Sequence, residues 1–136
     1  MISRTAAHAI TGLAVLAHLP EGGYAGAGEV AENIGAPRNY LGKLLKMLAD
    51  QGLVESQKGK GGGFRLARPA DTITLFDVIN PIDHLDRWSR CFLGGPNCSA
   101  ESPCPVHPKW GPVRDAYFRF LKQTTIAEIA QKEIIP

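Results

Sequence analysis

The sequence predicts a mainly α-helical fold that carries one small β-hairpin. Over most of the chain apolar residues recur every three or four positions, which is the spacing of amphipathic helices. Residues 53–68 differ, because LVESQ and FRLAR suit two short strands and KGKGGG between them suits a tight turn. The 136 residues, of which 44% are hydrophobic and 21% charged, are enough to bury one core.

Three helices are expected before the hairpin. The first follows Ser3, whose hydroxyl can cap it, and ends before Pro20. Its apolar face repeats at helical spacing through Ala6, Ile10 and Leu13. A Gly-rich loop then leads to the next helix.

The second and third helices are separated by a short turn. GEVAENIG (28–35) predicts a short helix that Gly35 ends in a left-handed conformation. APRNYLGKLLKMLADQG (36–52) predicts a longer helix, with Pro37 in its first turn and Gly52 at its end. Its apolar stripe consists of Leu41, Leu44, Leu45 and Leu48. The side chains that fall away from this stripe are Arg38, Asn39, Lys43 and Lys46.

Helices followed by a basic, Gly-rich hairpin form the pattern of a winged helix-turn-helix, whose third helix enters the major groove of DNA. Residues 38–68 contain seven basic residues against two acidic, a local charge of +5, whereas the rest of the chain has 8 basic and 11 acidic. This asymmetry favours one polyanion-binding face. Arginine and lysine can reach phosphates and guanine, and asparagine can pair with adenine. The predicted DNA-contacting residues are Arg38, Asn39, Tyr40, Lys43, Lys46, Lys58 and Lys60.

Two alternatives apply to these basic residues. Lys43 and Lys46 could serve only to keep an exposed helix soluble. GKGGG could form a phosphate cradle in an enzyme, but the P-loop spacing and its Lys-Ser/Thr ending are absent from the sequence. The sequence also contains no cofactor fingerprint and no legible arrangement of nucleophile and base. We therefore predict a DNA-binding protein that is not an enzyme.

A short helix and a long aromatic helix are expected after the hairpin. Thr74 and Asp77 form a capping box that opens a helix in TLFDVIN, which we expect to stop at Pro81. PVRDAYFRFLKQ (112–123) predicts a long helix with much aromatic surface. Its apolar residues are Val113, Ala116, Tyr117, Phe118, Phe120 and Leu121. We interpret it as a dimerisation helix, with packing inside its own subunit as the alternative. A second capping box, TIAE (125–128), opens a last short helix.

All the cysteines, Cys91, Cys98 and Cys104, lie in one Gly/Pro-rich segment, and His107 follows three residues after the last. No apolar run is long enough to cross a membrane and the N-terminus does not resemble a signal peptide, so we expect a cytoplasmic protein with reduced thiols. Thiolates suit zinc or iron-sulfur units. Structural zinc sites usually contain close CxxC pairs, whereas six and five residues separate these cysteines, so iron-sulfur is favoured. Disulfides and incidental thiols are the alternatives.

The order of these features resembles the iron-sulfur regulator family of IscR, NsrR and RirA type. The resemblance rests on the wing KGKGGGFRLAR, the helix ITLFDVI, a three-cysteine loop ending in CPVH, and an aromatic helix closing with TTIAEI. It covers nearly the whole chain. It implies a homodimeric transcription regulator that binds a double-stranded DNA operator, has no membrane partner, and senses redox state, iron or nitric oxide through an iron-sulfur cluster.

The resemblance also implies the cluster ligands. Cys91, Cys98 and Cys104 match the three family cysteines, and His107 matches the fourth ligand of IscR-like members. His8 lies where NsrR-like members supply a ligand from the partner subunit, and is the alternative. The match of His107 implies a 2Fe-2S cluster, with 4Fe-4S as the alternative. Six residues, not the commoner five, separate the first two cysteines, and this departure from the family pattern bears on the type of cluster more than on its presence. A zinc-binding or metal-free thiol-switch winged-helix protein is the alternative function.

These features divide the chain into four expected parts. Residues 1–69 form the winged helix-turn-helix, and 70–90 form a connecting helix and linker. Residues 91–107 form the cluster-binding loop. Residues 108–136 form the dimerisation helix and the C-terminal short helix.

Overall fold

The computed structural model describes residues 2–89, 92–93 and 105–131. It is mostly helical, with one two-stranded antiparallel hairpin, as the sequence predicts. The N-terminal half contains α1 (Arg4–Ala17), α2 (Ala27–Ile34), α3 (Arg38–Asp50), β1 (Val54–Gln57) and β2 (Gly63–Leu66). The second half contains α4 (Leu75–Asp83), α5 (His107–Gln123) and α6 (Ile126–Ala130), with short 3-10 turns at Ala70–Thr72 and Leu85–Ser89.

The first three helices begin and end close to the predicted positions. The hydroxyl of Ser3 caps α1 by accepting a 3.0 Å hydrogen bond from the N–H of Ala6. Gly35 ends α2 with φ of 70°, the left-handed conformation that glycine adopts without strain. The apolar faces of the helices meet in one core, whose most deeply buried side chains here include Leu13, Val30, Leu41, Leu45 and Leu48.

The hairpin is attached to the helices through its second strand. Val54 pairs with Leu66 and Gln57 with Gly63, in antiparallel register. Phe64 also exchanges two backbone hydrogen bonds with Ala25, of 2.9 and 2.8 Å, in the loop before α2. A Cβ at Gly63 would lie 2.5 Å from the carbonyl oxygen of Ala25, and φ there is 141°, so this close approach requires glycine. The hairpin is thereby held beside α2 and α3.

The helix α4 is longer than expected at its C-terminal end. The predicted capping box is present: Asp77 N–H donates to the Thr74 hydroxyl and Thr74 N–H donates to the Asp77 carboxylate. The helix does not stop at Pro81, which lies inside it. Proline in the last turn sacrifices few helical hydrogen bonds, and His84, in the left-handed conformation, closes the end by donating to Asn80 over 2.9 Å.

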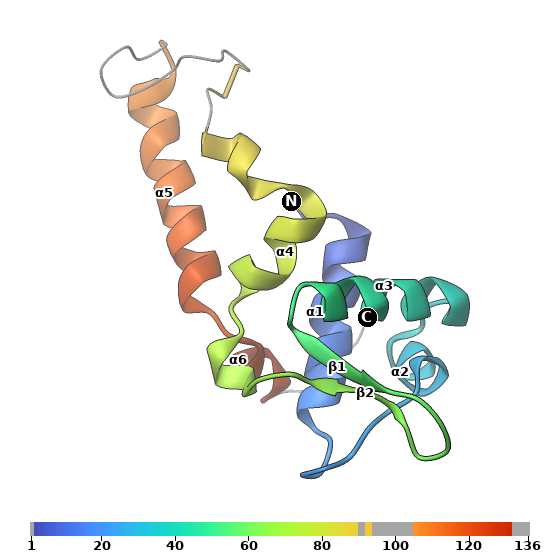
Figure 1. Ribbon diagram of the computed structural model, residues 1–136. Coiled ribbons are helices and arrows are strands. Elements are labelled where there is room, and N and C mark those ends of the chain that lie inside the picture. The colour runs from blue at the N-terminus through green and yellow to red at the C-terminus, as the bar shows by residue number, and fades with distance from the viewer. Residues whose placement is uncertain (1, 90–91, 94–104, 132–136) are drawn as a thin grey trace.

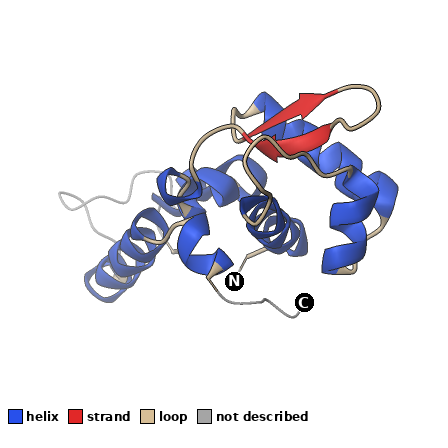
Figure 2. Cartoon of the chain, turned by 90° about the horizontal axis from the view of Figure 1, so that it is seen from below, coloured by secondary structure: helices blue, strands red, loops and turns tan. Residues whose placement is uncertain are grey.

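The C-terminal helices return to the first half of the molecule. Figure 1 shows α5 running beside α4 on the side away from the hairpin, and Figure 2 shows the hairpin at the opposite edge from α5. Leu121 of α5 is buried, and α6 packs against α1 after the predicted capping box of Thr125 and Glu128. Two backbone hydrogen bonds of 2.9 Å, from Leu75 to Thr124 and from Ile126 to Ile73, join the start of α4 to the start of α6. No helix in the described part of the chain is long and apolar enough to span a membrane.

Candidate nucleic-acid interface and cysteine segment

The outer face of α3 forms one wall of an open groove. Arg38, Asn39, Lys43 and Lys46 are all exposed and all line it, as the helical spacing predicts. The groove has a volume of about 550 Å³ and is also lined by Ala27, Gly28, Gly42 and Phe64. Small residues of α2 and α3, basic side chains of α3 and one residue of the hairpin thus line the groove together.

Arg38 lies directly over the backbone of Gly28. A Cβ built at Gly28 would come within 2.2 Å of two guanidinium nitrogens of Arg38 and within 2.5 Å of its Cζ. Such distances are far below van der Waals contact, so only a residue without a side chain allows this arrangement. No sequence pattern predicts this contact, because Gly28 belongs to a Gly-rich loop and helix start like its neighbours.

The tip of the hairpin extends the basic surface. Lys58 and Lys60 are exposed on the loop between β1 and β2. Arg65 on β2 is held differently: it pairs with Glu55 at 3.0 Å and its guanidinium lies 4.7 Å from the ring centre of Tyr24. The lysines at the tip are therefore the residues of the hairpin best placed for phosphate contact.

Tyr40 points toward α1, unlike the other predicted DNA-contacting residues of α3. Its hydroxyl shares a 3.1 Å hydrogen bond with Nδ1 of His8, and the two rings pack edge to face with centres 5.5 Å apart. Both side chains are half-buried. The structure thus brings a predicted DNA-contacting residue and the alternative cluster ligand into one pair, which links α1 to α3.

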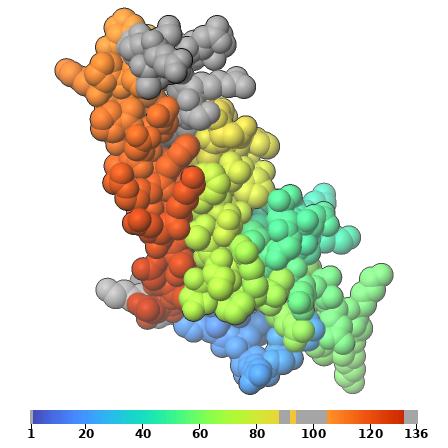
Figure 3. All heavy atoms as spheres, turned by 60° about the vertical axis from the view of Figure 1, so that its left-hand side comes forward, coloured from blue at the N-terminus to red at the C-terminus, as the bar shows by residue number. Residues whose placement is uncertain are grey.

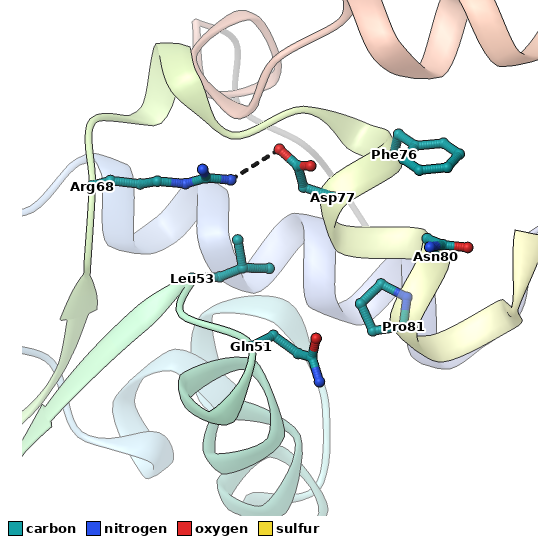
Figure 4. Close-up of a pocket in the computed structure, with 7 residues that line it drawn as sticks. All are labelled: Gln51, Leu53, Arg68, Phe76, Asp77, Asn80 and Pro81. Atoms are coloured by element: carbon teal, nitrogen blue, oxygen red, sulfur yellow. Dashed lines mark hydrogen bonds and ion pairs between the residues drawn. The ribbon is translucent and has the colours of Figure 1, made fainter.

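A second cavity lies between the end of α3 and α4. It has a volume of about 240 Å³, and its walls include Gln51, Leu53 and Asn80 (Figure 4). Arg68 reaches across from the end of the hairpin and pairs with Asp77 at 2.9 Å. This pair is partly exposed and contributes at most about 1 kcal/mol to stability. It neutralises one of the seven basic residues counted in residues 38–68.

One described residue of the cysteine segment contacts the first turn of α5. The three cysteines lie outside the described residues. Phe92, which follows Cys91 in the chain, packs against Trp110, with ring centres 5.2 Å apart. His107 is half-buried and begins α5, one turn before Trp110 and Gly111. Within the described ranges, no three His, Cys, Asp or Glu side chains are grouped closely enough to hold a metal ion.

The comparison with known proteins identifies the family. A model named Rrf2, described as an iron-dependent transcriptional regulator, matches residues 2–132. The chain belongs to the Rrf2 family. The predicted resemblance is therefore confirmed at the level of the family.

Individual Rrf2 relatives are also transcription regulators by name. Over 113 residues the chain is 36% identical to an HTH-type transcriptional regulator of Aquifex aeolicus, a match that covers 79% of this chain and 78% of that one. It is 29% identical over 126 residues to the HTH-type transcriptional regulator IscR of Escherichia coli, a match that covers 93% of this chain and 77% of that one. As a family member this Rrf2 chain is a DNA-binding transcription regulator, as predicted, and not an enzyme.

Solved structures confirm the winged-helix fold of this Rrf2 chain. CymR, the global cysteine regulator of B. subtilis, is 27% identical, with a TM-score of 0.78 and coverage of 96% of both chains. IscR of T. potens is 24% identical, with a TM-score of 0.75 and coverage of 96% and 86%, a likeness that concerns the fold alone.

Proposed function

We propose that this Rrf2 regulator is a cytoplasmic homodimer whose binding to a DNA operator is controlled by an iron-sulfur cluster on Cys91, Cys98, Cys104 and His107. The observation that carries the proposal is the joint presence, in one chain, of a basic α3 groove and a thiol-rich segment in which Phe92, next to Cys91, packs on Trp110 near His107. The family description as iron-dependent supports the same reading.

The DNA side of the proposal rests on α3 and the hairpin. The exposed Arg38, Asn39, Lys43 and Lys46 share one groove, and the hairpin is fixed beside it by the Ala25–Phe64 bridge. A helix of this kind fits the major groove, while a basic wing contacts the backbone or the minor groove next to it. We assign base contacts to α3 and phosphate contacts to Lys58 and Lys60.

The dimer side of the proposal rests on α5. Its inner face is used within the subunit, because Leu121 is 1% exposed and Phe118 packs edge to face on Phe76. Its outer face leaves Val113 and Phe120 59% and 53% exposed, seven residues apart on the same side. Figure 3 shows α5 forming one edge of the molecule, next to α4. We assign this outer face to the contact with a second copy of the chain.

The cluster side of the proposal rests on the chemistry of the ligands and on the contact between Phe92 and the start of α5. Phe92 packs on Trp110, so Cys91 is one residue in the chain from a contact with the first turns of α5, where His107 lies. Three thiolates and an imidazole are a donor set that suits an iron-sulfur cluster, here 2Fe-2S with 4Fe-4S as the alternative. We keep His107 ahead of His8, because it follows Cys104 by three residues, which is the position of the fourth ligand in the IscR-like members that the chain resembles.

When bound, a cluster of this kind supplies iron and sulfide that respond to iron supply, oxygen, peroxide or nitric oxide. The residues of the chain couple this response to DNA binding. Ligation by residues on both sides of the segment would order it against α5, and α5 of each copy fixes the separation of the two α3 helices. Half-sites on DNA lie about 34 Å apart, so a change in that separation alters operator affinity.

The test is anaerobic purification followed by an absorption spectrum and by iron, sulfide and zinc analysis per chain. We expect iron and sulfide in near-equal amounts with visible charge-transfer bands, and operator affinity that changes when the cluster is removed. Cys98→Ala should abolish the bands while circular dichroism stays that of the folded protein. Colourless protein with zinc, or with no metal, would refute the iron-sulfur assignment.

A metal-free thiol switch is the second candidate function. It is favoured by the likeness to CymR, whose S. aureus form, 27% identical with a TM-score of 0.74, was also solved in an oxidised form. On this reading reductant alone changes operator affinity in colourless anaerobic protein. The same preparation therefore separates the two candidates.

A further inference from the structure

Two polar contacts join the first turns of α1 to other helices. At the start of α1, Ser3 donates twice to the carboxylate of Asp83: its N–H over 2.9 Å and its hydroxyl over 2.5 Å. The same hydroxyl accepts from the N–H of Ala6, so it serves as N-cap and as link to α4 at once. A carboxylate at the N-terminus of a helix is also stabilised by the helix dipole.

Asp83 lies where the cysteine segment is approached. It is the last residue of α4, and His84 and the 3-10 turn Leu85–Ser89 lead from it toward Cys91. It also belongs to the helix that packs against α5, and its charge adds to the effect of burial in raising the pKa of Tyr117 on α5. Asp83 is therefore a residue through which movement of α5 or of the chain before Cys91 can reach α1.

The second contact lies five residues further along α1. His8 and Tyr40 join α1 to α3 through their 3.1 Å hydrogen bond and edge-to-face rings. Five residues of helix span about 7.5 Å. Between the two contacts Ala6 is 0% exposed, so this stretch of α1 is fixed against the core.

The first turns of α1 form the most direct connection between α4 and α3. α1 packs against both α4 and α3. The end of α3, by contrast, faces α4 across the cavity that Gln51, Leu53 and Pro81 line (Figure 4). Displacement of α4 is thus passed to α3 more directly through α1 than across the cavity.

We propose that Asp83 and the His8–Tyr40 pair are positioning residues for the recognition helix, and that residues 3–8 of α1 transmit the state of the cysteine segment to α3. The input to this link rests on the proposed function. The link itself rests only on the contacts of Ser3, Asp83, His8 and Tyr40. Tyr40 precedes the groove residue Lys43 by less than one turn, so the position of its hydroxyl sets the rotation of the basic face.

The test compares Asp83→Ala, Tyr40→Phe and the double variant with wild type. Operator affinity is measured for each in the cluster-loaded and cluster-free forms, and the ratio of the two affinities is the readout. We expect each single variant to move the ratio toward one by about threefold or more, a typical size for a residue on a coupling route. The double variant should add little, because both substitutions interrupt one route. Thr125→Ala, which removes a cap on α6, is the control that should keep the wild-type ratio.

Hydrogen exchange of α3 in the cluster-free protein tests the link without its input. Asp83→Ala should speed amide exchange along α3, whereas Thr125→Ala should not. If α3 exchanges as in wild type, or if the affinity ratio survives both single variants, the link is refuted. If wild type has the same operator affinity in both forms, but Asp83→Ala still speeds amide exchange along α3, the proposed function fails while the link stands.

Discussion

The guanidinium of Arg38 lies against Gly28, so its position depends on the absence of a side chain at residue 28. Gly28→Ala would place a Cβ 2.2 Å from the guanidinium and push it out of the groove. Because only the end of a flexible side chain has to move, and alanine suits a helix better than glycine by about 1 kcal/mol, the variant should unfold no more easily than wild type. We expect operator affinity to fall by about five- to tenfold, at the lower end of the roughly 1–3 kcal/mol of a single contact.

Gly26→Ala is the matched control for this substitution. A Cβ at Gly26 meets nothing within 4 Å, so operator affinity should stay at the wild-type level. Thermal unfolding and a fluorescence binding titration supply both readouts. Equal affinity of Gly28→Ala and Gly26→Ala would remove the role assigned to Gly28.

Lys60 at the hairpin tip has a different expected effect. A phosphate contact carries no sequence information, so Lys60→Ala should weaken binding to operator and unrelated DNA alike. The slope of log affinity against log salt concentration should fall by about one. Lys109→Ala, an exposed lysine on α5, is the control with the same charge change. A change confined to base preference would contradict the assignment of the wing.

Tyr40 marks the limit of sequence reasoning at this scale. Helical spacing correctly predicts that Arg38, Asn39, Lys43 and Lys46 share the outer face of α3. It does not reveal that the Tyr40 hydroxyl bonds to His8, because the two residues are 32 positions apart and no local pattern connects them. The Arg38–Gly28 contact escapes for the same reason, so the face is predictable while its individual tertiary contacts are not.

At the scale of elements, local hydrogen bonding was the most reliable signal. The caps at Ser3, Thr74 and Thr125 and the left-handed end at Gly35 are all present, because each involves residues within four positions of one another. The exceptions are α5, which begins at His107 and not at Pro112, and α4, which continues through Pro81 to Asp83. There a tertiary contact, from Asp83 to Ser3 on α1, adds stabilisation that local propensity does not contain.

The packing of α5 on α4 makes a prediction about pH. Burial, and then the charge of Asp83, raise the pKa of Tyr117 above its ordinary value of 10.0. The folded protein therefore holds the phenol proton more tightly than the unfolded chain. This contribution to stability is complete below pH 10.0 and is lost as the pH rises through the folded-state pKa.

Tyr117→Phe should accordingly lose less stability than wild type between pH values below and above 10.0. The measurement is the thermal unfolding midpoint of both proteins at a series of pH values below and above 10.0. The neutral-pH difference between them serves as the baseline, since loss of the hydroxyl itself changes stability at every pH. Parallel curves for the two proteins would show that the Tyr117 proton is not coupled to folding.

At the scale of the whole molecule, α5 divides its surface between two uses. The sequence shows an aromatic helix but cannot say which residues the subunit itself covers, because that depends on where α4 lies. The structure buries Leu121 and leaves Phe120 exposed, although the two are adjacent in the chain. An apolar ridge with Val113 and Phe120 more than half exposed is costly in water, and in the dimer we propose the same face of a second copy covers it by two-fold symmetry.

Phe120→Glu should therefore separate the dimer, while Phe120→Leu should preserve it. A buried, unpaired carboxylate on each side opposes association, whereas leucine retains most of the apolar contact. Sedimentation gives the mass of each variant, and circular dichroism checks that each is folded. A dimeric Phe120→Glu protein would assign the contact to another surface.

Operator binding by the separated subunits follows from the same geometry. Two α3 helices held in one dimer bind the second half-site at high effective concentration, which raises affinity by about a hundredfold or more over a single subunit. Folded, monomeric Phe120→Glu should thus lose about that factor on a two-half-site operator but bind an isolated half-site as wild-type subunits do. Equal losses on both DNAs would mean that the substitution had disturbed α3 itself, and that α5 and the recognition helix are less independent than their separation in the fold indicates.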